Sequence, residues 1–236
     1  MAEPFATLRL EHSSTVDRVA GALRRALFDG EVEAGTALRE QALAASLGVG
    51  RSTVREALGV LVAEGLATRE PHRGVTVASP DAATVTDVCR ARLVLEGAGV
   101  RRWPEATGAQ RDGVRLALGR YLAALRDGAS YEELNDRHLA FHVSLVGLTG
   151  SPRLVASAEQ LVRELRLALA QVDRVRRNAH AQDPGAGHAA LVRLLERGEV
   201  EAAHALLERH LAEARQAVLE ALGIDAGSTP TPGDLP

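Results

Sequence analysis

The chain has 236 residues, a formal net charge of −3, 46% hydrophobic residues and 25% charged residues. This balance is ordinary for a globular protein, and no apolar run approaches the roughly 20 residues that a membrane-spanning helix needs. The single cysteine, Cys89, excludes an internal disulfide. Because the N-terminus also lacks the charged-then-apolar order of a signal peptide, we expect a cytoplasmic protein.

After an N-terminal arm of residues 1–14, the first part of the chain has the pattern of three helices followed by a two-stranded ribbon. Apolar residues recur at helical spacing, and glycines stand where helices should end. The predicted helices cover residues 15–30, 40–47 and 51–64, and the predicted strands cover residues 66–70 and 74–78. This is the layout of a winged helix-turn-helix, which places its last helix in the DNA major groove. We therefore assign residues 15–78 to a DNA-binding domain.

Residues 79–81, Ser-Pro-Asp, interrupt this pattern and predict a linker. From residue 82 to residue 223 only helical periodicity is present. The predicted helices cover residues 82–102, 105–127, 131–148, 152–177, 186–197 and 200–222. Six helices joined by short loops favour an antiparallel all-helical bundle, so we expect a mainly α protein. Residues 224–236 are rich in Pro, Gly and Ser and are expected to be disordered.

The third predicted helix begins with side chains suited to reading DNA. Arg51 and Arg55 are four residues apart and therefore share one face of the helix. Every basic residue in the chain is arginine, whose planar fork matches guanine or phosphate. The candidate DNA-binding residues are Arg39, Arg51, Ser52, Thr53, Arg55, Arg73 and Gly74. Nearby acids such as Glu40 are expected on helix backs and ends, which would leave an acid-poor edge; the alternative is a solvated charged face.

The stretch LAASLGVGRSTVREAL, the segment LVAEGLATRE and the RGVTV ribbon resemble the N-terminal domain of the GntR superfamily of bacterial transcription regulators. The resemblance spans residues 15–78. It implies that Arg39, Arg51, Arg55 and Gly74 occupy positions at which family members contact DNA. The sequence departs from the family at Gly50, where a capping serine is usual, and at Thr53, where proline is frequent. Glycine is a tolerable N-cap, so the first departure weakens the helix start only slightly.

The second domain carries an unusual set of histidines. His138 and His142 are four residues apart, so both rings project from one helix face, which is a favourable arrangement for chelating a divalent transition metal. His188 and His210 lie on two later helices and could converge with them inside a bundle. The alternative is that these histidines are scattered by chance and make only single hydrogen bonds.

The segments RLVLE, HLAFHVSLVGLTGSPRL and GHAALVRLLERGEVEAAHALLERHL resemble the FCD branch of the same superfamily. The resemblance implies a helical effector domain that holds a metal through an Asp and three His residues. His142, His188 and His210 match the histidine positions, and His138 stands where the family has Asp. Asn135 shares the helix face of His142 and is a candidate effector-lining residue. Arg92 matches an arginine that faces the effector pocket; the alternative is an ion pair with Glu96.

Together these features predict a DNA-binding transcription regulator, a repressor, that acts as a homodimer on a palindromic operator. The helical domain is expected to sense a small carboxylate metabolite and to hold zinc or nickel. Two alternatives stay open. The same regulator could have a metal-free pocket for a larger or acyl ligand, or the histidines could belong to a metalloenzyme. Against an enzyme, no Glu or Asp is placed by sequence as a general base beside the histidines.

Overall fold

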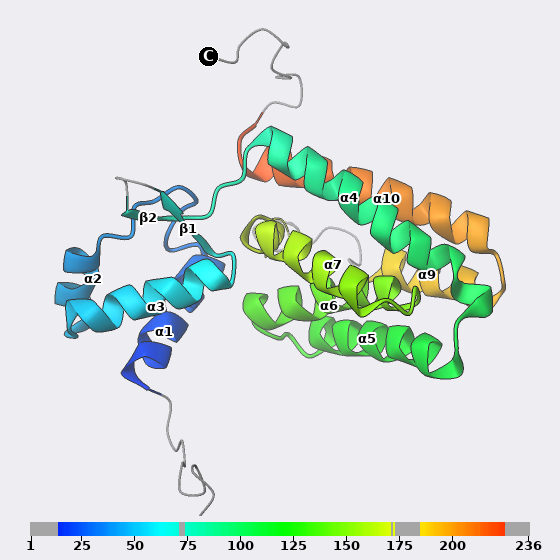
Figure 1. The fold of residues 1–236 in the computed structure, drawn as a ribbon, viewed down its shortest axis with the longest axis horizontal. Helices are drawn as coiled ribbons and strands as arrows, with labels where there is room; N and C mark the ends of the chain where they lie inside the picture. The colour runs from blue at the N-terminus through cyan, green and yellow to red at the C-terminus, as the bar shows by residue number, and fades with distance from the viewer. Residues whose placement is uncertain (1–13, 71–73, 171, 173–184, 225–236) are drawn as a thin grey trace, which may run out of the picture.

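The computed structural model describes residues 14–70, 74–170, 172 and 185–224, and it is mainly α-helical as predicted (Figure 1). The first three helices and the ribbon form the winged helix-turn-helix. Their bounds are α1 Thr15–Asp29, α2 Glu40–Leu47, α3 Arg51–Ala63, β1 Ala67–Glu70 and β2 Gly74–Val77. Ser14 starts α1 through a capping box with Asp17, and Gly30 ends it in the left-handed conformation. Residues 71–73, which include the candidate Arg73, lie outside the described part.

The ribbon is fixed to the chain segment that leads into α2. β1 and β2 pair antiparallel with Ala67 opposite Val77 and Glu70 opposite Gly74. The backbone N–H of Leu38 donates to the carbonyl of Val75 at 2.8 Å. This bond joins the residue that begins the turn into α2 directly to the wing. Val54, Leu58 and Leu61 of α3 are fully buried beneath them, as the apolar stripe predicts.

The second part of the chain is a helical bundle. Its elements are α4 Ala82–Arg101, the 3-10 turn η1 Trp103–Glu105, α5 Gly108–Arg126, α6 Tyr131–Gly147, α7 Pro152–Glu164, α9 Ala186–Glu196 and α10 Val200–Ala221. α4 runs beside α10 along one edge of the bundle, and α5 lies along the opposite edge (Figure 1). The helix predicted to begin at residue 105 in fact begins at Gly108, because Thr107 forms a capping box with Gln110. None of the described helices is long and apolar enough to cross a membrane.

One predicted helix was wrong. The sequence predicted a single helix over residues 152–177, but α7 ends at Glu164, and the helical residues 166–170 follow a turn at Leu165. The turn divides the apolar residues between two cores. Leu165 and Ala168 pack inside the bundle, whereas Leu167 and Ala170 pack into the core of the DNA-binding domain. Burial of both sets stabilises the arrangement that includes the turn.

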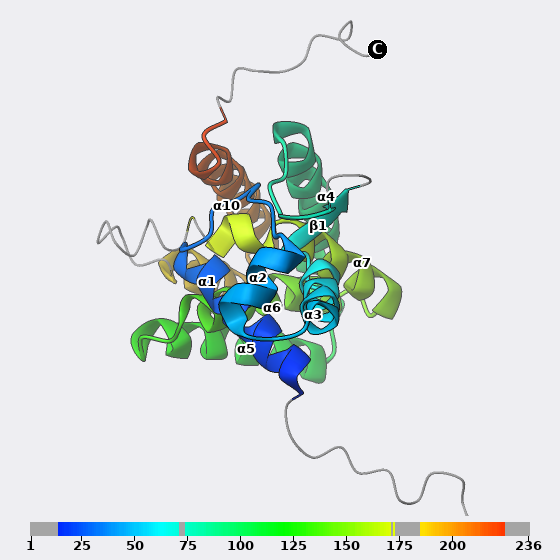
Figure 2. The ribbon, with the colours of Figure 1, turned by 90° about the vertical axis from the view of Figure 1, so that its left-hand side faces the viewer.

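The two domains are joined by close backbone packing and by ion pairs (Figures 1 and 2). Gly65, which has φ of 74°, lies so near the end of α7 that a Cβ there would come within 2.4 Å of the Arg163 carbonyl oxygen. Arg24 on α1, which donates two hydrogen bonds to Glu64 of its own domain at 2.9 and 2.6 Å, crosses the junction to lie 3.3 Å from Glu132 on α6. The DNA-binding domain is therefore seated on α6 and on the end of α7.

Candidate metal centre and DNA interface

Four histidines from three helices converge inside the bundle. His138 and His142 come from α6, His188 from the first turn of α9, and His210 from α10. One ligand nitrogen from each lies within 4.8 Å of the others. Three Nε2 atoms form a tight triangle with sides of 3.1 Å for His138–His188, 3.2 Å for His138–His142 and 3.3 Å for His142–His188.

This triangle has the size that a transition-metal ion requires. An ion about 2.0–2.1 Å from nitrogens spaced in this way would subtend angles of roughly 100°, close to a tetrahedral arrangement. His138, His142 and His188 are buried and His210 is partly buried, so the donor set is held by packing. Four imidazoles from separate helical turns could bind a divalent transition-metal ion, because neutral imidazole is a preferred ligand of zinc, nickel and copper.

A buried carboxylate stands behind the cluster, and sequence reasoning missed it. Nδ1 of His142 donates to Oε2 of Glu96 at 2.7 Å, while Oε1 of Glu96 accepts from Nε of Arg92 at 2.8 Å. With its proton on Nδ1, His142 directs the lone pair of Nε2 toward the other rings. Burial lowers the pKa of His142 well below its ordinary value, and the charge of Arg92 adds to this effect. The ring is therefore neutral, as a metal ligand must be.

Burial raises the pKa of Glu96 above its ordinary value, and the nearby guanidinium of Arg92 opposes that rise. The sequence placed no Glu or Asp as a general base beside the histidines, whereas the structure brings the carboxylate of Glu96 to His142. Glu96 contacts the His142 nitrogen that faces away from the triangle. It would therefore orient this ring and not bind the metal itself. The RLVLE motif contained the signal, because Arg92 and Glu96 are four residues apart. Nothing in the sequence showed that their helix packs on α6 next to His142.

Aromatic rings close the cluster on two sides. Tyr121 of α5 stacks on His138 with ring centroids 5.1 Å apart, and it meets His188 edge-on at the same distance. Phe141 meets His188 edge-on at 5.2 Å. Both aromatic side chains are fully buried. These contacts fix the orientations of the imidazoles before any ligand arrives.

Two candidate effector residues make contacts other than those expected. Arg92 is 2% exposed and forms the buried ion pair with Glu96, which is the alternative that the sequence left open. Asn135 is completely buried at the domain junction. In the amide orientation that satisfies its neighbours, Asn135 donates to the carbonyl of Arg166 at 3.3 Å and accepts from the N–H of Ala170 at 3.2 Å. It therefore links α6 to the segment that enters the core of the DNA-binding domain.

His204 on α10 lies outside the four-histidine cluster. It is half-buried, and its Nε2 lies 2.6 Å from where a Cβ of Gly97 would stand. A side chain at residue 97 would clash with the ring, so the contact between α4 and α10 depends on this glycine.

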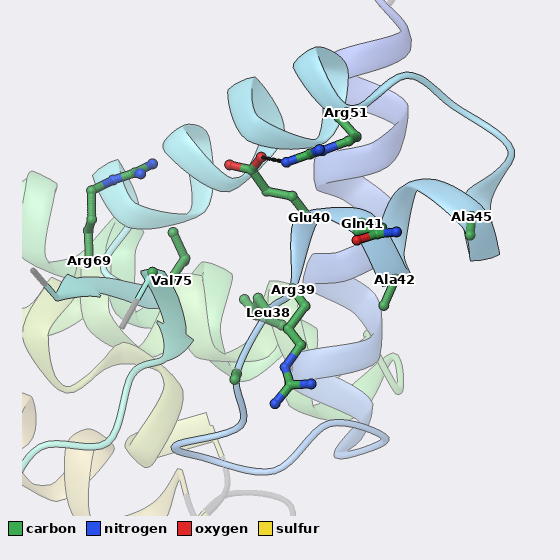
Figure 3. A pocket seen from close by; sticks show the side chains of 11 residues that line it. Leu38, Arg39, Glu40, Gln41, Ala42, Ala45, Arg51, Arg69 and Val75 are labelled. Atoms are coloured by element: carbon green, nitrogen blue, oxygen red, sulfur yellow. Dashed lines mark ion pairs between the residues drawn. The ribbon is translucent and has the colours of Figure 1, made fainter. Parts of the chain in front are cut away.

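Three of the expected DNA-binding residues, Arg39, Arg51 and Gly74, line a hollow on the surface of the first domain (Figure 3). The hollow has a volume of about 790 Å³ and is lined by the start of α2, by Arg51 and by the wing. Arg39 and Gly74 both line it, and Gly74 has φ of 83°, a conformation that favours glycine. Ser52 is exposed at the start of α3 and Thr53 is half-buried there.

The acid-poor edge expected from the sequence is wrong. Glu40 accepts two hydrogen bonds from Arg55, at 2.9 and 2.7 Å, and lies 3.8 Å from Arg51 (Figure 3 draws the Arg51 contact). The hydrogen bonds from Arg55 hold the pKa of Glu40 below its ordinary value, so this carboxylate is ionised. Arg51 and Arg55 still expose 64% and 57% of their side chains. Both guanidinium groups thus stay accessible, but each has a competing anion.

Arg69 is a cation at this surface that the sequence reasoning did not select. It extends from β1 toward the hollow that Arg39 and Arg51 also line (Figure 3). Three arginines, from the residue before α2, from α3 and from the wing, therefore line one concave surface, which fits a polyanion. Alternation along β1 gave no signal for Arg69, because it is two residues from the buried Ala67 and is nevertheless exposed.

Comparison with known proteins identifies both halves. The model of the gntR family of bacterial regulatory proteins matches residues 15–77, and the model of the FCD domain matches residues 87–213. The chain is 30% identical over 140 residues to the gluconate operon transcriptional repressor of Bacillus licheniformis, a match over 58% of this chain and 56% of that protein. It is also 30% identical over 143 residues to the transcriptional repressor GlaR of Escherichia coli, covering 59% and 65%. The chain thus spans only about half to two thirds of the length of these curated relatives.

Solved structures agree over a longer region. A putative GntR transcriptional regulator from Rhodococcus sp. RHA1 matches with a TM-score of 0.65 and 31% identity over 89% of this chain and 99% of that one. Escherichia coli McbR/YncC, with a TM-score of 0.58 and 22% identity, shares the fold. The family and these relatives are transcription regulators and not enzymes. The chain belongs to the GntR family of bacterial regulatory proteins and carries its FCD domain.

Proposed function

We propose that this protein is a metal-containing, ligand-responsive repressor that acts in the cytoplasm as a homodimer on a palindromic operator. The observation that carries the proposal is the convergence of four imidazoles within 4.8 Å inside the domain attached to a winged helix-turn-helix. Residues 15–78 would bind DNA, residues 79–81 would link the domains, and residues 82–223 would bind the effector. Arg51, Arg55, Ser52 and Thr53 would face the major groove, with Arg39, Arg69, Arg73 and Gly74 near the phosphates.

The metal is proposed to be zinc or nickel, held by His138, His142, His188 and His210. Four neutral imidazoles leave the charge of a divalent ion uncompensated, and the negative charge of Glu96 is already shared with Arg92. The centre would therefore attract an anion, which supports a small carboxylate as effector. Because the relative from Bacillus licheniformis is a gluconate operon repressor, gluconate is the first acid to test.

Metal content of the purified protein tests this proposal. Wild-type protein should carry one zinc or nickel ion per chain, and the His142→Ala/His188→Ala variant should carry none. A matched control, His204→Ala, removes an imidazole that lies outside the four-histidine cluster and should keep the metal. Wild-type protein that contains no metal and takes up none would contradict the metal centre. It would favour the same regulator with a metal-free pocket for a larger ligand.

Operator binding tests the DNA interface separately. If Arg51 contacts a base, Arg51→Ala should cost about 1–3 kcal/mol of operator binding and relax specificity at one position. Arg126→Ala, at the far end of α5, serves as the control for a general loss of positive charge. Gluconate should change operator affinity only under one condition. It must bind the arrangement of the two domains that is competent for DNA binding and the arrangement that is not with different affinities. Unchanged operator affinity in Arg51→Ala would refute the role of α3 in recognition.

A further inference from the structure

The outward face of α4 carries an exposed stripe that no part of the described chain covers. Its residues recur every three or four positions, which places them on one side of the helix. The stripe consists of Ala83, Asp87, Arg90, Val94, Ala98 and Arg101, all of them exposed. Val94 is 70% exposed, more than the other two exposed large hydrophobic residues of the described chain, Leu116 at 55% and Leu47 at 36%. α4 lies along an outer edge of the bundle beside α10, so this face is open to a partner (Figure 1).

Two of the three charged residues on the stripe, Asp87 and Arg101, stand at equal distances from Val94. Asp87 lies seven residues before Val94 and Arg101 lies seven residues after it, and two helical turns return nearly to the same face. Neither residue forms an ion pair with any residue that the structure describes, although neighbouring Arg102 pairs with Glu105. Asp87 and Arg101 are about 21 Å apart along one α4, at about 1.5 Å per residue, so they cannot pair within the same helix.

A second copy of the same helix satisfies both charges. If two α4 helices cross antiparallel with a two-fold axis at Val94, the two valines meet. Asp87 of each copy then lies opposite Arg101 of the other copy. The spacing of three and four residues is also that of the seam in paired helices. A two-fold interface must be self-complementary in this manner.

We propose that the exposed face of α4 is an interface with a second copy of this chain, centred on Val94 and flanked by two symmetric Asp87–Arg101 ion pairs. This inference deepens the homodimer included in the proposed function by specifying the surface that forms it. The antiparallel arrangement would separate the two starts of α4, at Ala82, by about 36 Å along the helix axes. The two DNA-binding domains would therefore leave the paired helices at opposite ends.

Charge exchange tests the pairing. In sedimentation experiments on the full chain, Asp87→Arg alone and Arg101→Asp alone should each raise the dimer dissociation constant about tenfold, because each creates two like-charge contacts. An equimolar mixture of these two variants should form a heterodimer of wild-type affinity, since both contacts then join opposite charges. The double variant Asp87→Arg/Arg101→Asp should likewise recover dimer formation. A role of either residue within its own chain would not produce rescue by mixing.

Hydrophobic variants locate the centre of the interface. Val94→Asp should weaken the dimer at least as strongly as either single charge variant, whereas the matched control Leu116→Asp on α5 should leave it unchanged. Single charge variants that dimerise like wild type would overturn the proposal, as would a mixture that shows no rescue or a wild-type chain that stays monomeric. These measurements need neither operator nor metal. Charge variants or mixtures that fail would refute only the α4 surface, whereas a monomeric wild-type chain would also refute the proposed homodimer. In either case the metal and operator tests of the proposed function stay independent.

Discussion

The clearest test of the metal centre is a change at Glu96, which is not itself a metal ligand but is hydrogen-bonded to one. Its two oxygens accept hydrogen bonds from Nδ1 of His142 at 2.7 Å and from Nε of Arg92 at 2.8 Å. Glu96→Gln keeps the shape but removes the negative charge. The guanidinium of Arg92, only 2% exposed, would then be buried without a counter-charge. Breaking a buried ion pair in this way costs about 3–5 kcal/mol of stability.

The effect on the metal is separable from the effect on folding. Loss of a carboxylate that orients a ligating histidine typically weakens metal affinity about 10–100-fold, or roughly 1.4–2.7 kcal/mol. The double variant Arg92→Met/Glu96→Gln removes both charges. Replacing a buried ion pair by groups of similar volume is often neutral for stability. The double variant should thus fold nearly as well as wild type and still bind metal about 10–100-fold more weakly.

Two measurements on each variant separate these effects. Denaturant unfolding of the metal-free protein gives the folding cost, and competition with a chelator of known affinity gives zinc affinity. The control is Arg102→Met/Glu105→Gln, which removes an ion pair whose side chains are 58% and 69% exposed. This control should change neither quantity appreciably. If the double variant at residues 92 and 96 binds zinc as tightly as wild type, then Glu96 does not orient His142 for a metal.

Three further outcomes are expected. Arg69→Ala should weaken binding to all duplex sequences alike and reduce the salt slope by about 1, as measured by fluorescence anisotropy at several salt concentrations. Glu40→Gln should tighten binding to a scrambled duplex, because Arg55 loses its competing anion; weaker binding would show that Glu40 instead positions Arg55 for DNA. Zinc at about 100 times its dissociation constant should add about 2.7 kcal/mol to the unfolding free energy of wild type. The His142→Ala/His188→Ala variant should show no such gain.

The sequence predicted elements whose causes are local. Helical periodicity and terminal glycines located α1, α2 and α3, and the spacing of His138 and His142 placed both rings on one face of α6. Partners far apart in the sequence were not predictable in the same manner. Glu96 and His142 are 46 residues apart, and they meet only because α4 packs on α6. No periodicity within either helix encodes that contact.

Two errors have the same physical origin. No glycine or proline marks the turn at Leu165, because the turn results from a division of apolar residues between two cores. The acid-poor edge failed because Glu40 at the start of α2 reaches across to Arg55 on α3, 15 residues away. In both cases the sequence shows whether each side chain is apolar or charged. Tertiary packing determines which residue that side chain contacts. His188 and His210 were nevertheless assigned to the same site as His142, because they match the histidine positions of the family. Their helices are remote in sequence from α6.

Helix α6 connects the histidine cluster to the DNA-binding domain through a continuous series of contacts. His138 and His142 stand on this helix, and about one turn before His138 the same helix carries Asn135 and Asp136. Asn135 contacts the backbone of residues 166–170, and Asp136 pairs with Arg166 at 2.6 Å. Arg166 in turn lies 3.8 Å from Glu64, and its guanidinium lies over the ring of Phe28 in α1 at 5.3 Å.

A rigid helix transmits displacement along its axis, so a ligand that moves His138 must also move Asn135 and Asp136. Packed interfaces of this kind change between discrete arrangements and do not deform continuously. The contacts among residues 166–170, Glu64 and Phe28 must therefore either hold α6 in place or change to a second packing. Ligand binding alters DNA affinity only in the second case, and then by no more than the difference in ligand affinity between the two packings. In the proposed regulator, the strength of the response would thus be set at the junction of α6 with the DNA-binding domain, whereas the histidine cluster would decide which ligand produces it.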